Sequence, residues 1–191
     1  MSRKKNYKEY EVIEKAMHLF WRNGYEATSV RMLEKEMGIN QFSIYSSFGN
    51  KEGVFIESLK CYKKKLQKEV DQLKFAQHGI ESIKKYFFNF LRFSKENSPR
   101  NGCLMVNTIN EFGDKADAFF QDEIAPFSDQ LQSIFKEKIK SDLELEEAEL
   151  QKLASFLSIS LQGLSMATKT FEQNELENYI EMTFSVLRAK N

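Results

Sequence analysis

Apolar residues recur along most of the chain at spacings of three and four, which is typical of helices that bury one stripe. In residues 8–23 this stripe includes Ile13, Met17 and Phe20, and Gly24 follows where a helix can end in the left-handed conformation. We find no segment that alternates apolar and polar residues as a half-buried strand does. The pattern therefore predicts an all-α fold.

Two short helices are predicted after the first one, with Thr28 or Ser29 placed to cap the earlier helix and Asn40 the later one. Gly38 permits a tight turn between them, and two helices joined in this way form the helix-turn-helix unit. The later helix, residues 41–48, carries no charge. A helix in the major groove of DNA favours small, hydrogen-bonding side chains with few carboxylates, so we expect this helix to bind DNA. The same spacing also fits an ordinary helical hairpin.

One residue of the earlier short helix departs from the usual pattern. Glu34 occupies a position where a helix-turn-helix unit usually has a small residue. We therefore expect the stem of Glu34 to bend outward.

The remaining sequence predicts longer helices. Asn50 is placed to cap a fourth helix over residues 51–74, which connects a head, residues 1–52, to a body, residues 53–191. Pro126 is expected to kink or interrupt one of the body helices. Five helices are predicted in the body, at about residues 80–97, 103–112, 114–141, 146–171 and 175–190. The chain is thus expected to contain about nine helices.

Composition supports a folded helical protein. Of the 191 residues, 29% are charged and 41% hydrophobic, and only two are proline. We find no apolar run of about 18 residues that could span a bilayer and no secretory signal, so no membrane partner and a cytoplasmic location are expected. Cys61 and Cys103 are expected to be free thiols in that compartment.

The net charge of zero conceals an uneven distribution. Residues 1–68 hold 14 Lys and Arg against 8 Asp and Glu, a net +6, whereas residues 69–191 hold 14 against 20, a net −6. A basic head would attract a polyanion such as DNA. Charge runs also often only solvate a helix face.

Catalytic patterns are lacking in this sequence. His18 and His78 are its only histidines, and there is no Gly-x-Ser-x-Gly segment, phosphate-binding glycine loop or metal-spaced cluster. We therefore expect no enzyme activity, no metal site and no cofactor.

The segment AMHLFWRNGYEATSVRMLEKEMGINQFSIYSSFGNKEGVF, residues 16–55, resembles the N-terminal DNA-binding domain of the TetR family of transcriptional repressors. The matching pieces are LF-x-x-x-GY-x-x-T, a glycine turn and I-Y-x-x-F-x-N-K-E. The resemblance implies base contacts from Gln41, Phe42 and Ser43, and phosphate contacts from Tyr45 and Lys51. The full predicted DNA-binding set is Arg31, Gln41, Phe42, Ser43, Tyr45, Ser46, Ser47 and Lys51.

The resemblance also implies a homodimer built mainly from the last two long helices, and a small-molecule pocket in the body. The residues expected at the dimer interface are Leu157, Leu161, Leu164, Tyr179, Ile180 and Phe184. The residues expected to line the pocket are Tyr86, Phe90, Phe93, Cys103, Asn107 and Met166. Residues of both sets would also fit the core of a monomer.

Cys103 offers a second kind of sensing. It follows Gly102 at a helix start, where the helix dipole can lower the pKa of a thiol. The segment GCLMVNT resembles one in a subset of the family that includes sensors of electrophiles or oxidants. A non-covalent ligand site and an inert buried thiol are the alternatives.

The function expected from these patterns is a ligand-responsive transcriptional repressor that binds a palindromic operator in double-stranded DNA as a homodimer. A small-molecule inducer would release it. The alternatives are a thiol-sensing regulator acting through Cys103, and a helical protein-binding adaptor that does not bind DNA.

Overall fold

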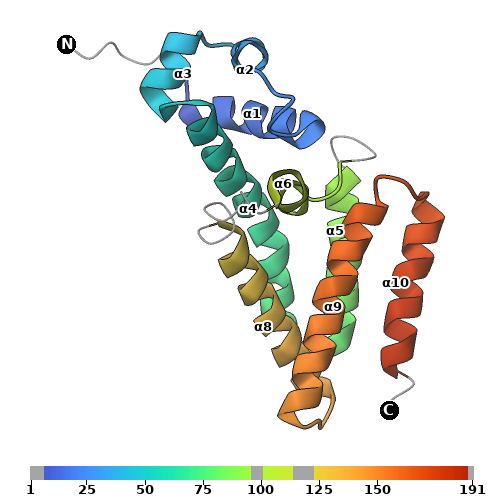
Figure 1. Cartoon of the computed structure of the whole chain (residues 1–191). Coiled ribbons are helices and arrows are strands. Elements are labelled where there is room, and N and C mark those ends of the chain that lie inside the picture. The colour runs from blue at the N-terminus through green and yellow to red at the C-terminus, as the bar shows by residue number, and fades with distance from the viewer. Residues whose placement is uncertain (1–6, 96–100, 114–122, 189–191) are drawn as a thin grey trace.

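The computed structural model describes residues 7–95, 101–113 and 123–188, and this part of the chain is helical with no strand (Figure 1). The all-α prediction is confirmed. The helices are α1 (Glu9–Asn23), α2 (Val30–Met37), α3 (Gln41–Phe48), α4 (Lys51–Phe75), α5 (Gly79–Lys95), α6 (Leu104–Phe112), α8 (Ala125–Asp142), α9 (Glu147–Ala167) and α10 (Gln173–Arg188).

The helix boundaries in the head follow local capping chemistry. α4 begins at Lys51 because the Asn50 side chain accepts a hydrogen bond from the Gly53 N–H at 2.8 Å. α1 ends at Asn23, and Gly24 follows with φ +80°, in the region that favours glycine. These ends agree with the sequence prediction to within about one residue.

The body differs from the prediction at two helix ends. Pro126 is the second residue of α8, where its missing N–H costs nothing, so it does not kink α8, and the predicted interruption of a longer helix stays a prediction. The predicted helix start at residue 114 falls in 114–122, outside the described residues. α9 ends at Ala167, about four residues before the predicted end, and turns occupy residues 168–170.

The head is built on aromatic and aliphatic packing between α1, α2, α3 and the first turns of α4. Phe20, Leu33 and Ile44 are fully buried there, and the rings of Phe20 and Phe55 meet edge to face at 4.9 Å between centroids. This shared core fixes the angle between α2 and α3.

The body packs α5 against α8, α9 and α10, with α4 along one side (Figure 1). Phe87 of α5 is fully buried and contacts Phe184 of α10 edge to face at 5.1 Å between centroids. Its ring is 6.1 Å from that of Phe135 of α8. α5 is therefore the central helix of the body.

Head and body share α4 and contact each other beyond it. α4 packs against α1 and α3 near its start and against α5 and α8 further along. The Trp21 indole N–H of α1 donates to the Gly102 carbonyl at 3.1 Å, and the Trp21 ring stacks on Phe93 of α5 at 5.6 Å. The division of the chain at residues 52 and 53 stays a prediction.

Within the described residues, every helix is too short or too polar to cross a membrane.

Candidate nucleic-acid interface

The turn between α2 and α3 has helix-turn-helix geometry. Ser29 caps α2 by accepting from the Met32 N–H at 3.2 Å, and Asn40 caps α3 by accepting from the Ser43 N–H at 2.9 Å. Between them Gly38 adopts a left-handed conformation with φ 71° and ψ 24°. Each feature was expected from the sequence, and together they hold α3 at a fixed angle to α2.

α3 presents one face to solvent and buries the opposite face. Ile44 is fully buried, whereas Gln41, Phe42, Tyr45 and Ser46 are exposed. These four side chains lie on adjacent turns of the helix because they are spaced by three and four residues. The accessible face therefore carries one amide, two aromatic rings and two hydroxyls, without any charge.

Tyr7 contacts two of the predicted DNA-contacting serines, Ser43 through its backbone carbonyl and Ser47 through its hydroxyl. The Tyr7 hydroxyl donates to the Ser43 carbonyl at 3.3 Å and lies 2.7 Å from Ser47 Oγ. Both serines are half-buried. They are placed to fasten the segment before α1 onto α3, a role that the sequence pattern did not indicate.

Glu34 does not bend away from α3, and the expectation of an outward stem is corrected by the structure. Its carboxylate accepts a hydrogen bond from the Gln41 N–H at 2.5 Å. A carboxylate at a helix N-terminus pairs with an N–H that lacks an intrahelical partner and with the positive end of the helix dipole. Glu34 thus acts as a second cap of α3, and this role depends on a tertiary contact.

The two cationic residues of the predicted set lie on either side of α3 in sequence. Arg31 is exposed in the first turn of α2. Lys51 is half-buried in the first turn of α4, with its ammonium 4.2 Å from the centroid of the Tyr25 ring. This cation–π contact holds Lys51 near a helix N-terminus, a position that favours phosphate.

Much of the positive charge of residues 1–68 lies on α4 and is balanced locally. Lys60 pairs with Glu57, Lys63 pairs with Glu123 at 2.6 Å, and Lys65 pairs with Glu14. The Lys64 ammonium lies 5.9 Å from the centroid of the Tyr10 ring. Several lysines of α4 are therefore engaged in contacts within the protein, so the net charge of residues 1–68 overstates the charge offered to DNA.

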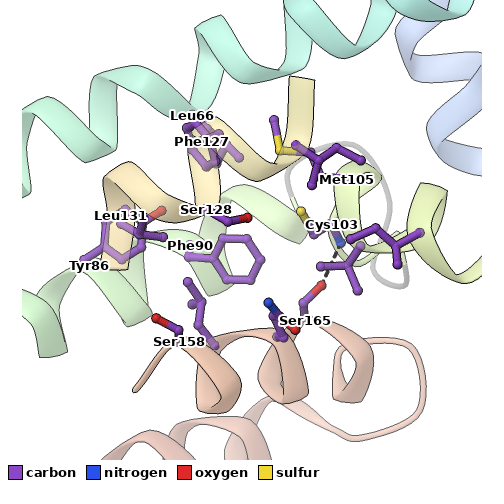
Figure 2. A pocket seen from close by; sticks show the side chains of 15 residues that line it. Leu66, Tyr86, Phe90, Cys103, Met105, Phe127, Ser128, Leu131, Ser158 and Ser165 are labelled. Atoms are coloured by element: carbon purple, nitrogen blue, oxygen red, sulfur yellow. Dashed lines mark hydrogen bonds between the residues drawn. The ribbon is translucent and has the colours of Figure 1, made fainter. Parts of the chain in front are cut away.

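The body contains a cavity of about 70 Å³ whose wall comes from α4, α5, α6, α8, α9 and the residues that flank α6 and α8 (Figure 2). Its wall is mostly apolar, with polar groups on α8 and α9. The predicted Tyr86, Phe90 and Cys103 belong to it. The other lining residues are Leu66, Met105, Val106, Ile109, Ile124, Phe127, Ser128, Leu131, Ser158, Leu161, Gln162 and Ser165.

The other three residues predicted for the pocket lie elsewhere. Phe93 packs on Trp21, Asn107 donates through Nδ2 to the Asn101 carbonyl at 2.8 Å, and Met166 is exposed. The residues contributed by α8 and α9 were missed because both helices carry apolar residues on more than one face. The sequence alone does not indicate which face meets the cavity.

Cys103 lies in the cavity wall, but its surroundings do not activate it. Its side chain is buried, its N–H donates to Ser165 Oγ at 2.9 Å, and it occupies the N-cap position of α6 without a capping hydrogen bond from its side chain (Figure 2). Burial raises the pKa of the Cys103 thiol, and the lowering effects of the neighbouring Tyr62 side chain and backbone groups do not offset it. The expectation that the helix dipole lowers this pKa is therefore corrected, because desolvation dominates.

α6 connects the cavity wall to the head. At its C-terminal end, Glu111 accepts hydrogen bonds from the backbone N–H groups of Tyr25 at 2.9 Å and Glu26 at 2.7 Å. Phe112 packs its ring on Tyr25 at 5.0 Å and on Phe55 at 5.8 Å between centroids. The same short helix thus lines the cavity and holds the turn between α1 and α2.

The residues predicted for dimerisation lie mainly in the core of the subunit. Five of the six are at most 8% exposed, and only Tyr179 is accessible, at 40%. A partner cannot pack on side chains that their own subunit covers. The five buried residues are Leu157, Leu161, Leu164, Ile180 and Phe184.

A different set of apolar residues is exposed on α9 and α10. Phe156, Ile159 and Met166 of α9 and Tyr179 and Met182 of α10 are all at least 40% exposed. The Tyr179 hydroxyl donates to the Ser160 carbonyl at 3.4 Å, so the exposed parts of the two helices adjoin. We call these five residues the α9–α10 face. The spacing of three and seven between Phe156, Ile159 and Met166 along α9 was the signal that could have separated them from the core stripe.

Comparison with known proteins identifies relatives over most of the chain. The family model for bacterial regulatory proteins, tetR family, matches residues 12–57. The HTH-type transcriptional repressor ComR of Escherichia coli (strain K12) is 28% identical over 183 residues, which cover 92% of this chain and 85% of ComR. The biofilm operon icaADBC HTH-type negative transcriptional regulator IcaR of Staphylococcus aureus (strain Newman) is 27% identical over 129 residues, or 63% of this chain and 69% of IcaR.

A solved structure with a similar fold contains DNA. It is a cysteine mutant of the TetR family transcriptional regulator CifR complexed with 26bp double-strand operator DNA. The alignment has a TM-score of 0.83 and 27% sequence identity, and it covers 96% of this chain and 98% of that one. The similarity therefore includes both the head and the body.

Proposed function

Because this chain is a transcriptional regulator of the TetR family, we propose that it binds a palindromic DNA operator as a homodimer, represses transcription and is released by a small molecule. Members of this family are regulators and not enzymes. The observation that carries the proposal is the uncharged, exposed face of α3, held rigidly by two helix caps and a buried Ile44.

The head has the chemistry that a major-groove interface requires. Gln41 can donate to and accept from a base edge, while Arg31 and Lys51 flank α3 and can pair with phosphates or guanine. The operator complex of CifR supports the same use of the matching domain here. Repression is proposed because ComR is named a repressor and IcaR a negative regulator. This role places the protein in the cytoplasm, where the bacterial chromosome lies.

Dimerisation is proposed through the α9–α10 face. Five large apolar side chains exposed on two adjoining helices form a patch that a monomer would leave in water. A two-fold pairing of this face in two copies would cover the patch and give the protein two heads. A palindromic operator with two half-sites requires that symmetry.

Ligand release is proposed to begin in the cavity. Its volume of about 70 Å³ is small beside the roughly 300–1,000 Å³ of typical small-molecule sites, so a ligand must widen it. Widening displaces α6, α8 or α9, because those helices provide most of the wall. A ligand that binds the widened state better than the DNA-bound state shifts the population away from DNA.

The test of DNA recognition uses sequences selected by the protein from a randomised duplex pool. We expect a palindrome with half-sites about one helical turn apart, and an affinity that falls steeply as salt rises. Gln41→Ala should reduce discrimination at one base pair of each half-site, by about 1–3 kcal/mol, while leaving binding to random DNA nearly unchanged. Gln151→Ala, at an exposed position of α9, is the matched control and should behave as the unmodified protein does.

Two outcomes would contradict the proposal. Failure to select any sequence would remove DNA recognition altogether and favour the adaptor alternative. Equal losses on selected and random DNA in Gln41→Ala would show that α3 is not the recognition helix.

A further inference from the structure

Phe42 is the most exposed large apolar side chain of the described residues. It is the second residue of α3 and keeps 81% of its surface accessible. A phenylalanine at that position contributes little to the folded state, because the core of the head is formed by Ile44 on the opposite side of the helix. The exposure of this ring therefore indicates a binding partner outside the subunit.

The backbone beneath Phe42 is fixed on both sides. The Gln41 N–H is held by the Glu34 carboxylate at 2.5 Å, and the Ser43 N–H is held by the Asn40 side chain at 2.9 Å. Tyr45, one turn further along α3, shares the same exposed face. The Phe42 ring is thus carried on a preorganised helix start, which reduces the entropy cost when a partner binds.

The chemistry of the ring selects what it can recognise in DNA. Phenylalanine has no hydrogen-bonding group, and the major groove offers one apolar group, the 5-methyl of thymine. We propose that Phe42 recognises thymine methyl groups in the operator, so that each half-site carries A·T base pairs where α3 begins. This inference rests on the proposed function of α3.

The neighbouring side chain fits the same base pairs. The amide of Gln41 can form two hydrogen bonds with N6 and N7 of adenine, the pairing typical of glutamine. With an apolar ring and an amide side by side, one residue can contact the thymine methyl while the other contacts an adenine edge. The absence of charge on α3 is consistent with A·T pairs, since guanine is recognised most often by arginine or lysine.

The test removes single methyl groups from DNA. Each thymine of a duplex selected from a randomised pool is replaced in turn by deoxyuridine, which pairs identically but lacks the 5-methyl. Removal of one buried methyl should weaken binding about fourfold, so one or two thymines of each half-site should respond in this way. In Phe42→Ala the same replacements should change the dissociation constant less than about twofold, because no ring remains to contact the methyl.

Two further variants separate this role from a general loss of binding. Phe75→Ala removes another exposed ring, 77% accessible at the end of α4, and should keep the full uracil response. Phe42→Leu keeps an apolar side chain and should therefore keep part of the response to deoxyuridine replacement. Variants that bind weakly can be measured at lower salt, where counterion release strengthens binding.

The outcomes distinguish this inference from the proposed function. A selected sequence whose uracil replacements have no effect would overturn the methyl contact while leaving DNA recognition intact. An equal uracil response in Phe42→Ala and the unmodified protein would also overturn it. If no duplex is selected, the proposed function fails first.

Discussion

Replacing Glu111 by alanine should loosen the head from the body. In the structure its two carboxylate oxygens accept the backbone N–H groups of Tyr25 and Glu26, at 2.9 and 2.7 Å. A hydrogen bond to a charged group that is shielded from water stabilises the fold by about 1.5–3 kcal/mol. Glu111 is exposed, so hydrogen bonds to water compensate for part of the stabilisation that is lost when its two bonds are removed. We therefore expect the free energy of unfolding to fall by about 1–2 kcal/mol when both bonds are removed.

Two measurements check this value. The melting temperature should fall by about 2–8 °C, given the roughly 2–4 °C per kcal/mol expected for a chain of this size. Hydrogen exchange at the Tyr25 and Glu26 amides should accelerate by about 5–30-fold if they open locally. Glu111→Gln should lie between the alanine variant and the unmodified protein, because its single amide oxygen can replace only one of the two acceptors.

The control is Glu177→Ala on α10, another exposed carboxylate, which accepts a hydrogen bond from Gln173 of the same helix at 2.6 Å. A surface change of that kind should alter stability by no more than about 0.5 kcal/mol. If Glu111→Ala melts like this control and the two amides exchange at unchanged rates, the contact does not hold the head to the body.

Three further outcomes are expected. Ile159→Asp places a charge on the α9–α10 face and should give folded monomers in sedimentation, whereas Gln151→Asp on the same helix should not; a dimeric Ile159→Asp protein would contradict the proposed interface. Lys51→Ala should weaken binding to all DNA sequences alike and reduce the salt slope by about one unit for each phosphate that Lys51 neutralises; a changed sequence preference with an unchanged slope would contradict this. The pKa of His18 is lowered below its ordinary value of about 6.5, mainly by burial and then by the charge of Lys65. Because the unfolded state then binds the proton more readily, the free energy of unfolding should fall as the pH drops through and below about 6.5. A His18→Gln protein with the same pH dependence would refute this.

The sequence was most informative where structure depends on neighbouring residues. Caps at Ser29, Asn40 and Asn50 and glycines at 24 and 38 act within one turn of the chain, so the helices of the head could be placed closely. The uncharged α3 likewise stood out by composition alone.

The features that the sequence did not predict depend on contacts between residues that are distant along the chain. Leu157 and Ile159 are both apolar residues of α9, yet one is fully buried and the other 69% exposed, and only the packing of α9 against its neighbours decides between them. Glu34 looked misplaced in α2 because its partner, the Gln41 N–H, lies on another helix. For Cys103, the helix start was correctly placed, but the burial that governs its pKa comes from the surrounding body.

The contact between Glu111 and the turn after α1 restricts how this protein can be recombined with its relatives in engineered biosensors. Gly24 has φ +80°, a conformation that is strained for other residues, and a Cβ atom there would lie 2.9 Å from the Glu111 carboxylate and displace it, so glycine favours both the turn and this contact. A hybrid that joins this head to a foreign body within α4 keeps the glycine but receives whatever residue ends the foreign α6. A hybrid therefore loses the stabilisation of about 1–2 kcal/mol from this contact unless Gly24 and the carboxylate at the end of α6 are transferred together.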